Sequence, residues 1–300
     1  MGQEQAQTIT QIAGLSEISD RYEAILCDIW GVLHDGLASF AEASEALVSF
    51  RRRGGVVILI SNAPRPFAPI ERQVLKLGVS SEAFDAVVTS GDVTIGLMEQ
   101  QAGDQVLHIG PDRDLPLFDA AMEQIGARPR LVSLEDAQYV LCTGLRSDET
   151  ETLDDYQLEL RAISSRGMAM ICANPDIVIH RGDTLIHCAG ALARRYEDLG
   201  GSVVYAGKPY GPIYDRALLL AERARGAPID KHRVLAIGDG MKTDIVGATR
   251  AGLDALFVTG GIHRSLHKED LTSPADPFEL RQLYDENEVW PVAAIPVLRP

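Results

Sequence analysis

The sequence lacks the features that mark several large classes of protein. Its four cysteines are widely spaced and form no C-x-x-C pair, which predicts reduced, structural thiols rather than a disulfide framework or a thiolate zinc site. No run approaches the roughly 20 apolar residues of a membrane-spanning helix. The N-terminus also lacks the basic and apolar segments of a signal peptide. We therefore expect a cytoplasmic protein with no membrane partner.

Positive charge is also scarce. Lys and Arg total 28 against 43 Asp and Glu, so the formal net charge at pH 7 is −15. A chain with this balance and no local basic patch repels a nucleic-acid backbone, and we expect no nucleic-acid partner. The sequence contains no Gly-x₄-Gly-Lys-Ser/Thr loop and no Gly-x-Gly-x-x-Gly fingerprint after a strand. Nucleotide-dependent transfer and nicotinamide redox chemistry therefore have no motif to support them.

Short apolar, β-branched runs alternate with amphipathic segments along nearly the whole chain. This alternation predicts an α/β fold built on a mostly parallel sheet. The apolar runs predict strands over 24–29, 56–60, 86–89, 105–109, 139–143, 168–172, 202–205, 234–237 and 255–258. Apolar residues spaced by three and four predict helices over 43–53, 69–77, 152–166, 185–199, 213–225 and 243–251.

The chain is organised as two domains in this interpretation. Nine strands are many for one doubly wound sheet. The residues that look chemical fall into two groups, the first ending near Asn62 and the second beginning near Lys208. We therefore predict a core formed by 1–90 and 205–300 and an inserted α/β domain over 91–204, with each boundary placed to within about ten residues.

Four polar segments follow predicted strands of the core. Parallel strands bring their carboxyl ends to one edge of a sheet, so we expect these segments to meet there. The acidic members are Asp28, Asp239 and Asp244, and the other polar members are Ser61, Asn62 and Lys208.

This set of side chains suits phosphoryl transfer assisted by a divalent cation. A carboxylate that attacks a phosphoryl group needs its negative charge offset, because otherwise two anions must approach each other. Mg²⁺ prefers hard oxygen ligands, so Asp28 and Asp239 suit it better than they suit zinc or copper. Asp244 is either a further ligand or a brace for one. Lys208 adds a positive charge that can hold both the nucleophile and the transferring group.

Four segments resemble the motifs of the haloacid dehalogenase (HAD) superfamily: Asp28-Ile29-Trp30-Gly31-Val32, Ile60-Ser61-Asn62, Gly207-Lys208-Pro209 and Gly238-Asp239 through Asp244. The likeness extends over nearly the whole chain and is to the class IIA branch, which includes sugar phosphatases, 4-nitrophenylphosphatases and pyridoxal phosphate phosphatases. Within it, the first motif is similar to that of an Asp-x-Trp-Gly-Val subgroup. The resemblance implies a Rossmann-like core with an inserted α/β cap of the C2 type. It also implies Mg²⁺-dependent hydrolysis of a small phosphorylated metabolite, a sugar phosphate or similar compound, through an aspartyl-phosphate.

The resemblance also implies the catalytic and metal-binding roles. Asp28 would be the nucleophile, and Lys208 would stabilise the charge of the transferring phosphoryl group. The Mg²⁺ ligands would be Asp28, the backbone carbonyl of Trp30, Asp239 and, in support, Asp244.

Phosphate and substrate contacts are implied at two further places. Ser61 would bind phosphate through its hydroxyl, with the Asn62 amide beside it. The segment Asn174-Pro175-Asp176 is similar to the Asn-Pro-Asp signature of class IIA caps, which places Asn174 and Asp176 near the substrate. Similar proteins often form dimers through the cap, so the resemblance is compatible with a homodimer.

One position departs from the pattern of the active phosphatases. They carry a second aspartate two residues after the nucleophile as general acid and base, and this chain has Trp30 there. An indole has no group that titrates near neutrality, so Trp30 cannot shuttle that proton. His34 and Asp35 are the nearest titratable substitutes, although the same two residues could simply shape a turn before Gly36.

Three interpretations follow from this departure. Activity persists on leaving groups that need no protonation, another residue substitutes for the missing acid, or turnover has been lost. In the last case the chain would be a regulatory protein that binds metal and a phosphorylated ligand with little or no phosphatase activity.

Overall fold

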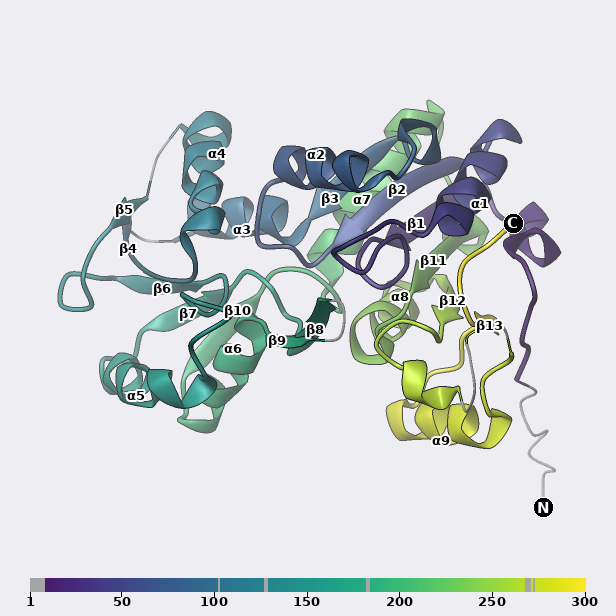
Figure 1. Ribbon diagram of the computed structural model, residues 1–300. Coiled ribbons are helices and arrows are strands. Elements are labelled where there is room, and N and C mark those ends of the chain that lie inside the picture. Colours follow the sequence, from purple (N-terminus) through teal and green to yellow (C-terminus); the bar gives the residue numbers. More distant parts are fainter. Residues whose placement is uncertain (1–8, 102, 127–128, 182–183, 268–270, 272) are drawn as a thin grey trace, which may run out of the picture.

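The computed structural model describes residues 9–101, 103–126, 129–181, 184–267, 271 and 273–300. Two parallel sheets lie at opposite ends of the molecule, and a two-stranded hairpin lies near their junction (Figure 1). The first sheet has six described strands, in the order β13 (Ala293–Ile295), β12 (Asp254–Val258), β11 (Val234–Gly238), β1 (Ala24–Asp28), β2 (Val56–Ser61) and β3 (Ala86–Thr89). All of its described strand pairs are parallel.

Helices cover both faces of the first sheet because its central strands are apolar on both sides. Ile25 and Leu26 are neighbours in β1 and point to opposite faces, so they join different buried clusters. The face of Ile25 is covered by α1 (Ala41–Arg52) and α2 (Phe67–Leu77). The face of Leu26 is covered by α7 (Gly211–Arg225), α8 (Val246–Ala251) and α9 (Pro277–Asn287).

The second sheet is also parallel and is formed by residues between 105 and 205. Its described strands have the order β10 (Ser202–Tyr205), β7 (Ala169–Cys172), β6 (Tyr139–Cys142), β4 (Gln105–Ile109) and β5 (Arg130–Leu131). One face packs against α3 (Ser90–Glu99) and α4 (Pro116–Ile125), and the other packs against α5 (Gln157–Ser165) and α6 (Ala189–Asp198). Helix α3 joins the two parts, since Val93 belongs to the core of the first sheet and Ile95 to that of the second.

The nine strands predicted from the sequence are all present, with their ends shifted by at most one residue. The helix predicted over 185–199 is wrong at its start, because the structure has a strand there and the helix begins at Ala189. That strand is β9 (Thr184–His187), which pairs antiparallel with β8 (Val178–Arg181). Leu185, Ala189 and Leu192 are spaced as on a helix, and this spacing concealed the hairpin.

The strand order places the polar ends of three core strands next to one another. β1 lies between β11 and β2, and Asp28 at its last position pairs with Ile60 of β2. Ser61 ends β2, and Asp239 follows β11. The three side chains therefore leave the sheet at the same edge. Among the described helices, none has both the length and the apolar character of a membrane span.

Candidate active site

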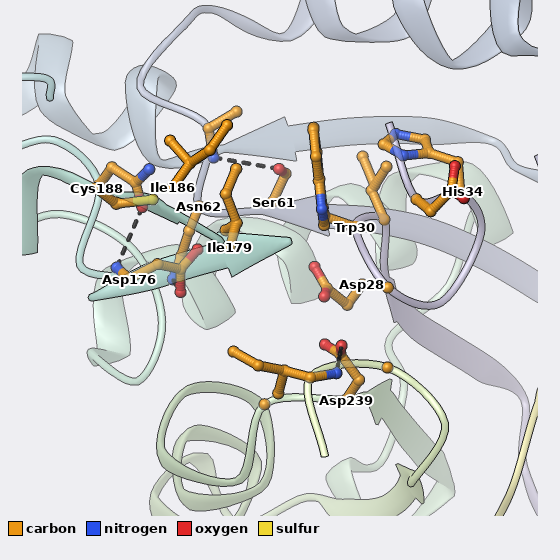
Figure 2. A pocket seen from close by; sticks show the side chains of 18 of the residues that line it. Asp28, Trp30, His34, Ser61, Asn62, Asp176, Ile179, Ile186, Cys188 and Asp239 are labelled. Atoms are coloured by element: carbon orange, nitrogen blue, oxygen red, sulfur yellow. Dashed lines mark hydrogen bonds between the residues drawn. The ribbon is translucent and has the colours of Figure 1, made fainter. Parts of the chain in front are cut away.

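A cavity of about 510 Å³ lies over this edge of the first sheet. Its floor includes Asp28, Asp239 and Lys208. Its opposite wall comes from the part of the molecule that contains the second sheet. This wall includes Asp176 after β7 and Ile186 of the hairpin (Figure 2). The cavity is thus built by segments that are far apart in the sequence.

Three buried carboxylates converge at the floor of the cavity. Asp28, Asp239 and Asp244 each offer an oxygen, and these oxygens all lie within 4.8 Å of one another. Hard oxygen ligands of this kind are those that Mg²⁺ and Ca²⁺ take in proteins. The donor set therefore fits a divalent cation.

Glycines make room for Asp239. A Cβ atom at Gly31, where φ is +81°, would come within 2.0 Å of Asp239 Oδ2, and one at Gly261 within 1.9 Å. The backbone N–H of Ile262 donates a hydrogen bond to the same oxygen over 2.8 Å. These contacts hold the Asp239 carboxylate between the loops that follow β1 and β12.

A tight turn holds Asp244. Residues Met241–Ile245 form a π-helical turn, and the N–H of Gly240 donates to Asp244 Oδ2 over 3.0 Å. Lys208 Nζ donates to the other oxygen, Asp244 Oδ1, over 2.7 Å. Both carboxylate oxygens are therefore oriented by donors.

Lys208 lies between two of the three carboxylates. Its Nζ is 2.5 Å from Asp28 Oδ1 and 2.7 Å from Asp244 Oδ1, and its side chain is 3% exposed. Burial alone would lower the pKa of Lys208, but the surrounding carboxylates, Asp244 first, raise it well above the ordinary value. The side chain is therefore an ammonium ion under all ordinary conditions.

One ammonium does not balance three clustered carboxylates. Burial, followed by the charge of Asp244, raises the pKa of Asp28 well above its ordinary value. The same two causes raise the pKa of Asp239 to about 7. Both shifts disfavour the ionised carboxylates when only the protein's own charges are present. A divalent cation beside these carboxylates would favour the ionised form of both groups.

Asn62 joins the two halves of the pocket. Its Oδ1 accepts a hydrogen bond from the backbone N–H of Lys208 over 2.7 Å. Its Nδ2 donates to Asp176 Oδ1 over 2.9 Å and to the Lys208 carbonyl over 3.2 Å. Both amide hydrogens take part in these hydrogen bonds. Asn62 therefore positions the backbone of Lys208 and the side chain of Asp176. The phosphate contact predicted for it stays a prediction.

The other predicted substrate contacts also line the cavity. Ser61 Oγ accepts a hydrogen bond from the N–H of Ala63 over 3.2 Å, which leaves its own hydrogen available to a ligand. Asn174 Oδ1 accepts the N–H of Asp176 over 3.1 Å (Figure 2). That contact turns the segment after β7 toward Asn62, and so the structure brings all the residues predicted for the site together.

Comparison with known proteins agrees with this geometry. A family model described as haloacid dehalogenase-like hydrolase matches residues 25–123, and one described as HAD-hydrolase-like matches 205–282. A crystal structure of a haloacid dehalogenase-like hydrolase from Brucella suis is 43% identical and superposes with a TM-score of 0.84. The match covers 96% of this chain and 99% of that one. The chain belongs to the haloacid dehalogenase-like hydrolase family. The resemblance to the HAD superfamily is confirmed, as is the Rossmann-like α/β fold, whereas the Asp-x-Trp-Gly-Val subgroup stays a prediction.

Two curated relatives are less similar in sequence. The 5′-nucleotidase YutF of Bacillus subtilis is 24% identical over 251 residues, which cover 83% of this chain and 91% of the relative. The D-glycerol 3-phosphate phosphatase of Mycobacterium tuberculosis is 26% identical over 290 residues, which cover 94% of this chain and 76% of the relative.

Trp30 packs against other residues of the loop that follows β1 in this HAD hydrolase. Its indole lies between Ser61 and His34 in the close view (Figure 2), and it meets the His34 ring edge to face with centroids 5.0 Å apart. A Cβ at Gly36, where φ is +89°, would come within 2.7 Å of the indole. The loop after β1 is therefore shaped around Trp30.

The two predicted substitutes for the missing acid serve the same loop. His34 is buried, its Nδ1 accepts the N–H of Gly36 over 3.0 Å, and burial lowers its pKa to about 4. Asp35 Oδ1 accepts the N–H groups of Leu37 and Ala38, both over 2.9 Å, and these bonds lower the pKa of Asp35. The geometry thus favours the turn interpretation for both residues.

Two ion pairs on the cavity wall were not predicted. Arg65, after β2, lies 3.8 Å from the buried carboxylate of Asp114, which belongs to the part that contains the second sheet. Arg113 lies 2.7 Å from Asp148. Neither pair has a local sequence signal, because the partners of each pair are 35 or more residues apart.

Proposed function

We propose that this hydrolase is a Mg²⁺-dependent phosphatase that acts on a small phosphorylated metabolite through an aspartyl-phosphate on Asp28. The observation that carries the proposal is the position of Lys208 Nζ, which lies within 2.7 Å of both Asp28 and Asp244 at the floor of the cavity. The nearby third carboxylate, Asp239, completes a set that fits a divalent cation. The names of the two curated relatives, a 5′-nucleotidase and a glycerol phosphate phosphatase, support small phosphorylated substrates.

The chain's own residues would each have a distinct role in the reaction. Asp28 attacks phosphorus, and the bond from phosphorus to the leaving oxygen breaks. Lys208 holds the attacking carboxylate and offsets charge on the phosphoryl group, while the Ser61 hydroxyl donates to a phosphate oxygen. Water then attacks phosphorus, and the bond to Asp28 breaks to release phosphate.

The metal would be held by Asp28, the Trp30 carbonyl, Asp239 and Asp244. When bound, it would offset the negative charge of the phosphate and of the attacking carboxylate, so that the two anions can approach. Removal of the metal should therefore abolish turnover while the fold is retained.

We further propose that residues 91–204 act as a cap over the core 1–90 and 205–300. The β8–β9 hairpin turns Ile179 and Ile186 toward the cavity (Figure 2), and Asp176 is held to Asn62 of the core. Side chains from this half would select the substrate, whether a sugar phosphate or a similar metabolite.

Release of inorganic phosphate tests the proposal. We expect hydrolysis of 4-nitrophenyl phosphate and of some members of a panel of phosphorylated sugars and cofactors in Mg²⁺, and none in EDTA. Asp28→Asn should abolish it, because the amide is not a nucleophile. Asp35→Asn is the matched control, since it makes the same chemical change in the exposed turn of the neighbouring loop. Activity that survives Asp28→Asn would overturn the proposal.

A second function is favoured by Trp30. With an indole where the active phosphatases carry an acid, the chain could bind metal and a phosphorylated ligand with little turnover. Tight binding of phosphorylated compounds in Mg²⁺ without release of phosphate from any of them would favour this regulatory role.

A further inference from the structure

Trp30 takes the position in the loop after Asp28 where the active phosphatases carry the acid that protonates a departing alkoxide. Trp30 stands two residues after the nucleophile, and its indole N–H is a donor that does not ionise near neutrality. The ring lies between Ser61 and His34 in the close view (Figure 2). A leaving oxygen in this part of the cavity therefore meets an aromatic side chain.

The acids near Asp28 are already engaged. Asp176 accepts the Asn62 amide, and Asp244 accepts both Lys208 Nζ and the N–H of Gly240. Asp35 accepts two backbone N–H groups of its own turn.

The remaining titratable groups lie on the cap side of the cavity or on the loop that follows β1. Asp114 and Asp148 are paired with arginines, and His34 accepts the N–H of Gly36 through Nδ1. His187 of β9 also lines the cavity, but it lies on the hairpin and not on the loop that follows Asp28. Among the described residues that line the cavity, the carboxylates near Asp28 are thus held in hydrogen bonds or ion pairs.

We infer that this site acts on phosphorylated compounds whose leaving group departs as a stable anion, such as aryl or acyl phosphates, and discriminates against alkyl phosphates. The inference rests on the proposed function and narrows its substrate class. It also separates this chain from relatives named for nucleotide and glycerol phosphate substrates.

The chemistry of the first step explains the preference for a leaving group that is a stable anion. An oxygen of Asp28 forms a bond to phosphorus, the bond to the leaving oxygen breaks, and its electron pair stays on that oxygen. A phenol ionises near pH 10, as tyrosine does, whereas an alcohol resembles water with a pKa of about 15.7. A phenolate or carboxylate can leave without a proton, but an alkoxide needs one in the transition state. General acid help is typically worth about 10²- to 10⁴-fold in rate.

The cap side of the cavity suits an aryl group. Ile179 and Ile186, from the paired strands of the hairpin, are directly opposite each other in the register and face the cavity (Figure 2). Leu37 and Ile262 also line it. An aromatic ring between these side chains and Trp30 would bury apolar surface that a polyol could not.

A leaving-group series tests the inference on the full-length protein in Mg²⁺. We would measure kcat/KM for phenyl phosphates with ring substituents of graded electron withdrawal, for acetyl phosphate and for glycerol 3-phosphate. Wild type should show a steep decline as the leaving-group pKa rises. Trp30→Asp should flatten this dependence and raise the rate on glycerol 3-phosphate by about 10²- to 10⁴-fold. Trp30→Phe, which restores no acid, is the matched control and should keep the steep dependence.

The kcat/KM measurements on wild type test the inference even if a Trp30 variant fails to fold. Equal efficiency on aryl and alkyl phosphates would overturn the inference while leaving the proposed phosphatase in place. Release of phosphate from no member of the series would contradict the proposed function, and the inference with it.

Discussion

Replacement of Lys208 by methionine should destabilise the fold, because it removes a buried cation from the floor of the cavity. The ammonium is buried and contacts Asp28 and Asp244 at 2.5 and 2.7 Å. Methionine fills a similar volume but leaves both carboxylates facing each other and Asp239 without a cation. Removal of one partner from a buried ion pair typically costs about 3–5 kcal/mol.

The cost should depend on pH and on metal. At low pH the carboxylates take up protons, so the difference in the free energy of unfolding between Lys208→Met and wild type should shrink. Magnesium should also restore part of the loss, because a cation that binds only the folded state adds about 2.7 kcal/mol at 100 times its Kd. The variant has more uncompensated negative charge and should therefore gain more from Mg²⁺ than wild type.

Urea denaturation in EDTA and in Mg²⁺, at pH 5 and pH 8, measures these quantities. We expect the largest deficit for Lys208→Met at pH 8 in EDTA and the smallest at pH 5. Lys242→Met is a control, since Lys242 lies in the neighbouring turn with no ion pair described for it. If Lys208→Met were as stable as wild type at pH 8 in EDTA, the electrostatic account of the floor of the cavity would be refuted.

Two further predictions concern Asp239. Its pKa of about 7 lies above the ordinary 3.8, so the metal-free folded state binds more protons and loses stability as pH rises from about 4 to about 7. Asp239→Asn should weaken that slope in urea denaturation, and an unchanged slope would contradict the shift. Gly31→Ala would bring a Cβ within 2.0 Å of Asp239 Oδ2 and should abolish stabilisation by Mg²⁺ in thermal denaturation. Gly126→Ala, with φ +71° and no neighbour within 4 Å, should only lower stability by about 1–2 kcal/mol.

The parts of the fold that could be predicted are those whose signal is local. The strands β1 and β2 are buried on both faces and are therefore continuous apolar runs. The polar residues after them could be brought together in advance, because parallel topology alone puts strand ends at one edge.

The parts that could not be predicted depend on tertiary contacts. Helix α3 begins with the buried polar residues Ser90, Asp92 and Thr94, whose partners include Ala206 and Phe67. Its sequence has no amphipathic pattern because both sides are buried. The β9 strand was concealed by helical spacing around Leu185.

The same limit applies to the site. The Asp28, Lys208 and Asp239 side chains could be assigned to one cavity from their motifs. The hydrogen bond between Asn62 and Lys208 joins residues that are 146 positions apart in the sequence, and no local pattern marks it. Whether His34 and Asp35 could replace the acid depended on hydrogen bonds within their own loop.

Capture of the covalent intermediate tests the central claim most directly. The chain would be mixed with 4-nitrophenyl phosphate and Mg²⁺, quenched in acid within milliseconds, digested and analysed by mass spectrometry. The account predicts one phosphoryl group on the peptide that contains Asp28, lost in Asp28→Asn and absent in EDTA. Phosphate release with no label on that peptide, or a label on another residue, would contradict it.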